Sequence, residues 1–134
     1  MNMSKPAFVA MLVALSPTPN KPDWLQLSDI TDIFRRLQEL GVDLGYVLIH
    51  QSAHGYYSNT AEEIVGNWLR FGWASYENSY KLTECGRKAL DSMIKRGEAE
   101  DPEESRRIKD GVAKIMKQIA VAAWNSSSSS TLWR

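Results

Sequence analysis

The side chains best suited to bind a metal are two histidines and one cysteine. His50 and His54 lie four residues apart, and Cys85 is the only cysteine in the chain. A structural zinc site needs four ligands, and no fourth ligand stands at a convincing spacing. The two histidines fall in a predicted strand and turn, where this spacing does not bring both imidazoles to one face as a helix would. We therefore expect no metal ligands in this chain.

Motifs of covalent or phosphate-transfer chemistry are missing from the sequence. There is no Gly-rich phosphate loop and no Gly-x-Ser-x-Gly elbow, and Cys85 has no obvious activating partner. Glu62 and Glu63 stand at the start of a predicted helix, where the helix dipole favours carboxylates. Asp101 belongs to an acidic stretch, residues 98–104, that is typical of a solvated joint. We expect neither catalytic residues nor a cofactor.

A second group of side chains has the chemistry to contact nucleic acid. Asn bonds adenine through two hydrogen bonds, Ser and Thr serve many partners, and Lys and Arg contact phosphates. The candidate nucleic-acid-binding residues lie on the predicted helix 60–71 and on the hairpin and helix that follow it: Ser58, Asn59, Thr60, Asn67, Arg70, Lys81, Arg87 and Lys88. A second interpretation stays open, in which the first three residues only cap the helix.

The charge pattern gives mixed support to nucleic-acid binding. Sixteen basic residues balance sixteen acidic ones, so the whole chain exerts no net attraction on nucleic acid or on an anionic membrane. Helix 60–71 carries Glu62 and Glu63 against Arg70 alone. Basic side chains are found instead on later segments and on one earlier helix. They form either a basic surface that contacts the phosphate backbone or a solvated helix face. These residues are Arg35, Arg36, Lys95, Arg96, Arg106, Arg107, Lys109, Lys114 and Lys117.

Apolar spacing and capping residues predict the elements that position these side chains. We expect helices at residues 6–15, 28–40, 60–71, 83–97 and 102–124, with Ser28 and Thr83 as N-caps. Residues 45–50 are predicted to form a strand, residues 54–57 a turn, and residues 73–82 a hairpin around Glu77 and Asn78. The expected packing face of helix 83–97 carries Cys85, Ala89, Leu90 and Met93.

The last helix carries an apolar stripe that must be covered, either by the domain's own core or by a second chain. The stripe consists of Ile108, Val112, Ile115, Ile119 and Ala122. A run of five serines follows within residues 125–131 and lacks the apolar residues needed to fold alone. We expect a flexible tail there.

Residues 67–90 carry the most distinctive pattern of the chain. A helix ends at Gly72, a short hairpin follows, and Tyr80-Lys81-Leu82-Thr83 leads through Gly86 to Ala89-Leu90. This order resembles the end of a winged helix-turn-helix domain, in which a recognition helix is followed by a two-stranded wing. Thr83 is expected to cap the next helix, and Gly86 to permit close approach to a neighbouring backbone. The resemblance implies a fold that is mainly α with a small β-hairpin, extended by a C-terminal helix.

A longer segment, residues 33–90, is similar to winged-helix proteins of the Panacea antitoxin type. The matching residues are Phe34, Leu37, Leu40, Gly41, Gly45, Tyr46, Gly55, Tyr57 and Ser58. Tyr56 stands where that family has proline, so the turn geometry does not carry over. The resemblance implies that a protein partner is an alternative to DNA.

Together these observations predict a winged-helix domain over residues 1–97, a C-terminal helix over 98–124 and a Ser-rich tail over 125–134. We expect a cytoplasmic DNA-binding transcriptional regulator, dimeric through the last helix, with double-stranded DNA as its partner. The alternative is a protein-interaction module (an antitoxin, an adaptor or a phage-type modulator) that does not bind DNA. The chain has no apolar run of about 18 residues, so we expect no membrane span. We interpret the N-terminal apolar segment as a helix capped by Ser4, not as a signal peptide.

Overall fold

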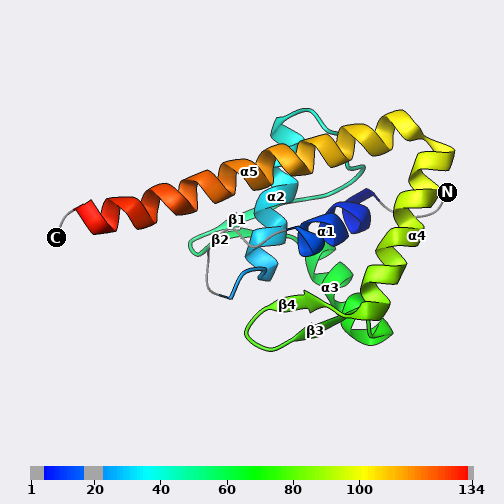
Figure 1. The fold of residues 1–134 in the computed structure, drawn as a ribbon, viewed down its shortest axis with the longest axis horizontal. Helices are drawn as coiled ribbons and strands as arrows, with labels where there is room; N and C mark the ends of the chain where they lie inside the picture. The colour runs from blue at the N-terminus through cyan, green and yellow to red at the C-terminus, as the bar shows by residue number, and fades with distance from the viewer. Residues whose placement is uncertain (1–4, 17–22, 133–134) are drawn as a thin grey trace.

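Five helices and two short β-hairpins make up residues 5–16 and 23–132, which the computed structural model describes (Figure 1). Each hairpin is a separate two-stranded antiparallel sheet. The prediction of a mainly helical chain with a small amount of β-structure is therefore confirmed. In chain order the elements are α1 (Lys5–Leu15), α2 (Leu27–Glu39), β1 (His50–Ser52), β2 (Gly55–Tyr57), α3 (Asn59–Phe71), β3 (Ala74–Tyr76), β4 (Tyr80–Leu82), α4 (Glu84–Glu100) and α5 (Pro102–Leu132).

Helix α1 lies at the centre of the molecule and contacts all four other helices (Figure 1). Its sequence is apolar on nearly every side, and a helix of that kind is stable only when it is surrounded by protein. Phe8, Val9, Met11 and Val13 are accordingly buried. The expected cap, Ser4, lies outside the described residues.

Helix α2 begins earlier than its sequence suggested. Its N-cap is Gln26, not Ser28, and the Asp29 carboxylate accepts a hydrogen bond of 2.7 Å from the Gln26 backbone N–H. Ile30, Ile33, Phe34 and Leu37 form its buried stripe.

The strand predicted at residues 45–50 is wrong in its position. Strand β1 starts only at His50 and pairs with β2 in the register His50 to Tyr57. Of the segment predicted as a turn, His54 lies in a turn, whereas Gly55–Tyr57 form strand β2. Gly45 has a positive φ of 78°, and its N–H bonds the Asp43 carboxylate. The Gln38 side chain donates to the Val47 carbonyl at 3.1 Å, which ties the apolar segment before β1 to α2 instead of to a strand. Tertiary contacts outweighed the β propensity of these residues.

The segment from α3 to α4 follows the predicted order. Ser58 caps α3, Gly72 ends it with φ of 72°, and Asn78 has φ of 73° in the turn between β3 and β4. Thr83 caps α4, because its hydroxyl accepts a 3.1 Å hydrogen bond from the Gly86 N–H. The strands β3 and β4 do not pair with β1 or β2. Cys85 is exposed and does not join the packing face predicted for it, because in the first turn of α4 the residue that lies against the hairpin is its neighbour Gly86.

Helix α5 packs along the body and then projects beyond it (Figure 1). Ile108, Val112, Ile115 and Met116 are buried in contacts with α1, α2 and α4, so this half of the apolar stripe is covered by the chain's own core. Val121 and Trp124 are exposed on the projecting part.

The end of α5 differs from the prediction of a flexible tail after residue 124. The helix continues through the serine run to Leu132. Elongating an existing helix costs far less than nucleating one, and the docked first half of α5 supplies the nucleus. Residues 133 and 134 of the expected tail lie outside the described residues. Among those described, no helix is both long and apolar enough to cross a bilayer.

Candidate functional site

The eight predicted nucleic-acid-binding residues do not form one surface. Ser58 is fully buried, and its hydroxyl accepts a hydrogen bond of 3.2 Å from the Ala61 N–H. It is therefore a capping residue with no surface to offer a base. Asn59 is exposed, but its side-chain oxygen accepts a hydrogen bond from the Tyr57 hydroxyl.

The start of α3 is a small polar cluster centred on Tyr57. Besides Asn59, the Tyr57 hydroxyl bonds the Glu62 carboxylate at 2.6 Å. This hydrogen bond raises the pKa of the Tyr57 phenol above its usual value, because the carboxylate stabilises the protonated hydroxyl. The cluster gives the first turn of α3 negative charge that opposes a phosphate backbone.

Thr60 and Asn67 point to a groove instead of to open solvent. Both are half-buried and line a groove of about 320 Å³. Its other lining residues come from α1, α3, the start of the second hairpin and α4: Ala7, Met11, Glu63, Ile64, Trp68, Phe71, Trp73 and Met93. Glu63, Phe71 and Met93 were not among the predicted site residues. The spacing of Thr60, Glu63, Asn67 and Phe71 by three, four and four residues marks one line along a helix, and this signal was readable in the sequence.

The four predicted cationic contacts are exposed, and only two of them, Lys81 and Arg87, line a common cavity. Lys81 and Arg87 line one cavity of about 530 Å³ at the base of the β3–β4 hairpin. Within the described part of the chain neither side chain forms an ion pair. Lys88 stands 3.7 Å from Glu84, one turn earlier on α4. Arg70 lies on the last turn of α3.

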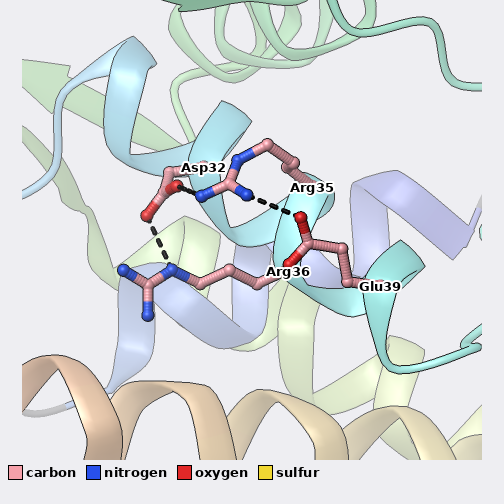
Figure 2. A network of polar contacts seen from close by, with 4 residues as sticks. All are labelled: Asp32, Arg35, Arg36 and Glu39. Atoms are coloured by element: carbon pink, nitrogen blue, oxygen red, sulfur yellow. Dashed lines mark hydrogen bonds and ion pairs between the residues drawn. The ribbon is translucent and has the colours of Figure 1, made fainter.

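Arg35 and Arg36 are already paired on α2, as Figure 2 shows. Arg35 bonds both Asp32 and Glu39 at 2.7 Å, and Arg36 reaches the other oxygen of Asp32 at 2.9 Å. The Arg35 guanidinium also lies 4.6 Å from the centre of the Tyr56 ring. Arg35 and Arg36 are therefore less available for the phosphate contacts expected of them, because Asp32 and Glu39 balance their charge. Arg35 also holds β2 against α2 through the Tyr56 ring.

The residues considered for a metal site are dispersed. His50 lies beside the Tyr57 ring, with 6.1 Å between ring centres, and Cys85 is on α4. Over residues 5–16 and 23–132, no three His, Cys, Asp or Glu side chains gather in a way that would hold a metal ion.

No protein-family model matches this sequence, and comparisons with curated proteins and with solved structures also find no match. A functional interpretation therefore depends on the geometry and charge of the surface around α3.

Proposed function

We propose that the chain is a winged-helix-type protein-interaction module whose binding surface comprises the exposed side of α3 and the β3–β4 hairpin. The observation that carries this proposal is the composition of that side of α3. Glu62, Glu63, Leu69 and Phe71 are exposed there, with Arg70 as the only basic side chain. Phosphate contacts require several cations around the base-reading residues, whereas protein interfaces combine apolar anchors with mixed charges.

The exposed apolar side chains strengthen the case for a protein partner. Phe71 is 55% exposed, Tyr76 on β3 is 51% exposed, and Leu69 is 46% exposed. Aromatic side chains supply much of the binding energy in protein interfaces because they bury a large area with few rotatable bonds. The order of a glycine-ended helix, a hairpin and a capped helix supports the winged-helix description of this scaffold.

Selection from a random-peptide display library tests the proposal. Peptides enriched on the wild-type protein are expected to bind the double variant Phe71→Ser, Tyr76→Ser at least about tenfold more weakly, since two exposed anchors are lost. Tyr46→Ser is the matched control, because Tyr46 is an 86% exposed aromatic residue outside this surface. Failure to enrich any peptide, or equal binding to the double variant, would contradict the proposal.

DNA binding remains the second candidate because of Lys81 and Arg87. These two cations share one cavity at the hairpin base and are free of ion pairs within the described residues. If they contact phosphates, affinity for random duplex DNA falls steeply as salt rises, and the variant Lys81→Gln, Arg87→Gln reduces that slope by about two. For a protein-interaction module we expect no duplex binding even at low salt.

A further inference from the structure

The groove beside α3 has an apolar floor. Helix α1 contacts both α3 and α4, and its Met11 lies at the base of the groove with Ile64 and Trp68 of α3. These three side chains are buried. Phe71 and Trp73 form one end, with ring centres 5.2 Å apart, and Met93 of α4 also lines the groove. Methionine side chains are flexible and polarizable, so Met11 and Met93 suit an apolar side chain inserted from outside.

One line of polar side chains follows α3 along this groove. The side chains of Thr60, Glu63 and Asn67 lie on the same side of α3, and none of them forms a hydrogen bond or an ion pair with the described part of the chain. Glu63 is the only ionisable side chain among the described lining residues. An unpaired carboxylate beside apolar surface favours a Lys or Arg from a partner, which gains a charge-assisted hydrogen bond there.

The distance between the Glu63 carboxylate and the apolar end of the groove at Phe71 limits the shape of the partner. Glu63 and Phe71 are eight residues apart on α3, or about 12 Å along the helix axis. A partner helix lying along α3 covers that distance in about two turns. Helices bound in grooves present one apolar face with anchors at regular helical spacing.

We propose that this groove binds an amphipathic helical segment of a partner protein, with an apolar anchor against Phe71, Trp73 and Met93 and a Lys or Arg about two turns away on Glu63. This inference rests on the proposed function and names the chemistry of its partner. We expect the partner segment to be basic because the charges are then complementary: the described lining residues of the groove include a carboxylate and no cation.

Three labelled synthetic peptides test the inference by fluorescence anisotropy. They are amphipathic helices of about 18 residues that share a Leu anchor and differ only in carrying Lys, Gln or Glu two turns away. We expect the Lys peptide to bind the wild-type protein at least about tenfold more tightly than the Glu peptide. Glu63→Gln should remove the preference for Lys, whereas Glu103→Gln should keep it, because Glu103 is an exposed carboxylate on α5 and does not line the groove. Phe71→Ala should weaken all three peptides alike.

Two results separate this inference from the proposed function. If library peptides depend on Phe71 but Glu63→Gln leaves their binding unchanged, the module stands and the basic-segment inference is wrong. If neither the library peptides nor the three synthetic peptides bind the wild-type protein, the protein-interaction proposal itself is overturned. Glu63 is exposed, so an unchanged melting temperature of Glu63→Gln will verify that the variant is folded.

Discussion

Gly86 holds α4 against the start of the β3–β4 hairpin. A Cβ atom at this position would lie 2.0 Å from the Trp73 carbonyl oxygen, so no other residue fits without moving the hairpin. The Trp73 carbonyl also accepts a hydrogen bond of 2.9 Å from the Thr83 N–H. The distance between Gly86 and Trp73 therefore sets where the hairpin sits relative to α4.

We expect Gly86→Ala to lower the free energy of unfolding by about 3 kcal/mol, because the added methyl group overlaps backbone that cannot easily move. Gly66 is the matched control, since it lies inside α3 and a methyl group added there would meet nothing within 4 Å. Gly66→Ala should raise stability by about 0.5–1 kcal/mol through helix propensity. Urea unfolding measures both changes. Equal effects of the two substitutions would show that the close approach is not present in solution.

The β3–β4 hairpin is attached to the start of α2 as well as to α4. The Tyr80 N–H donates to the Leu25 carbonyl at 3.0 Å, and the Tyr76 hydroxyl donates to the Gln26 side chain at 3.0 Å. The Gln26 amide in turn donates to the Asn78 carbonyl. A residue distant in sequence thus binds both a strand and the turn of the hairpin, which holds the proposed binding surface in place.

Gln26→Ala is expected to loosen the hairpin with little effect on the core. The lost hydrogen bonds are exposed, so the cost to global stability is about 1 kcal/mol. Amide hydrogen exchange at Glu77 and Ser79 should accelerate more than exchange in α1. The control is Gln51→Ala on the exposed strand β1, which should change neither. Unchanged exchange in the hairpin of Gln26→Ala would contradict this attachment.

At the scale of the molecule, α5 has two halves with different roles. The first half is part of the core, and the second half projects from the body (Figure 1). A second chain is not needed to cover Ile108, Val112 and Ile115, because α1, α2 and α4 already do so. The homodimer through the last helix stays a prediction, and only Ile119 and the residues after it remain to support it.

Truncation of the chain within the second half of α5 tests whether the two halves have different roles. Removal of residues 126–134 should leave the melting temperature unchanged within error, since no residue of the described core is lost. Ile115→Ala should cost about 3 kcal/mol, because Ile115 is 1% exposed and its truncation leaves a cavity. Thermal unfolding followed by circular dichroism measures both. A large loss of stability on truncation would indicate that the projecting half packs against something, and light scattering would then show whether it is a second chain.

Much of the segment from Ser58 to Gly86 was predictable because its signals are local. A glycine with positive φ ends α3, an asparagine makes the hairpin turn, and a threonine caps α4; each depends on a few neighbouring residues. The segment before β1 was not predictable, because Val47 is tied to α2 through Gln38. The backbone conformation of this segment depends on a contact with Gln38 of α2, which no local pattern in the segment itself indicates.

The amino-acid order alone determined the presence and order of the helices, the second hairpin and the acidic character of α3, since propensity, capping and charge are properties of neighbouring residues. Only the tertiary structure decided which side chains share a surface. It buried Ser58, placed the Tyr56 ring of β2 against the Arg35 guanidinium of α2, and brought Met11, Glu63 and Met93 from three helices to one groove. The physical reason is that helix packing joins residues far apart in sequence, and no local pattern encodes which helices will meet.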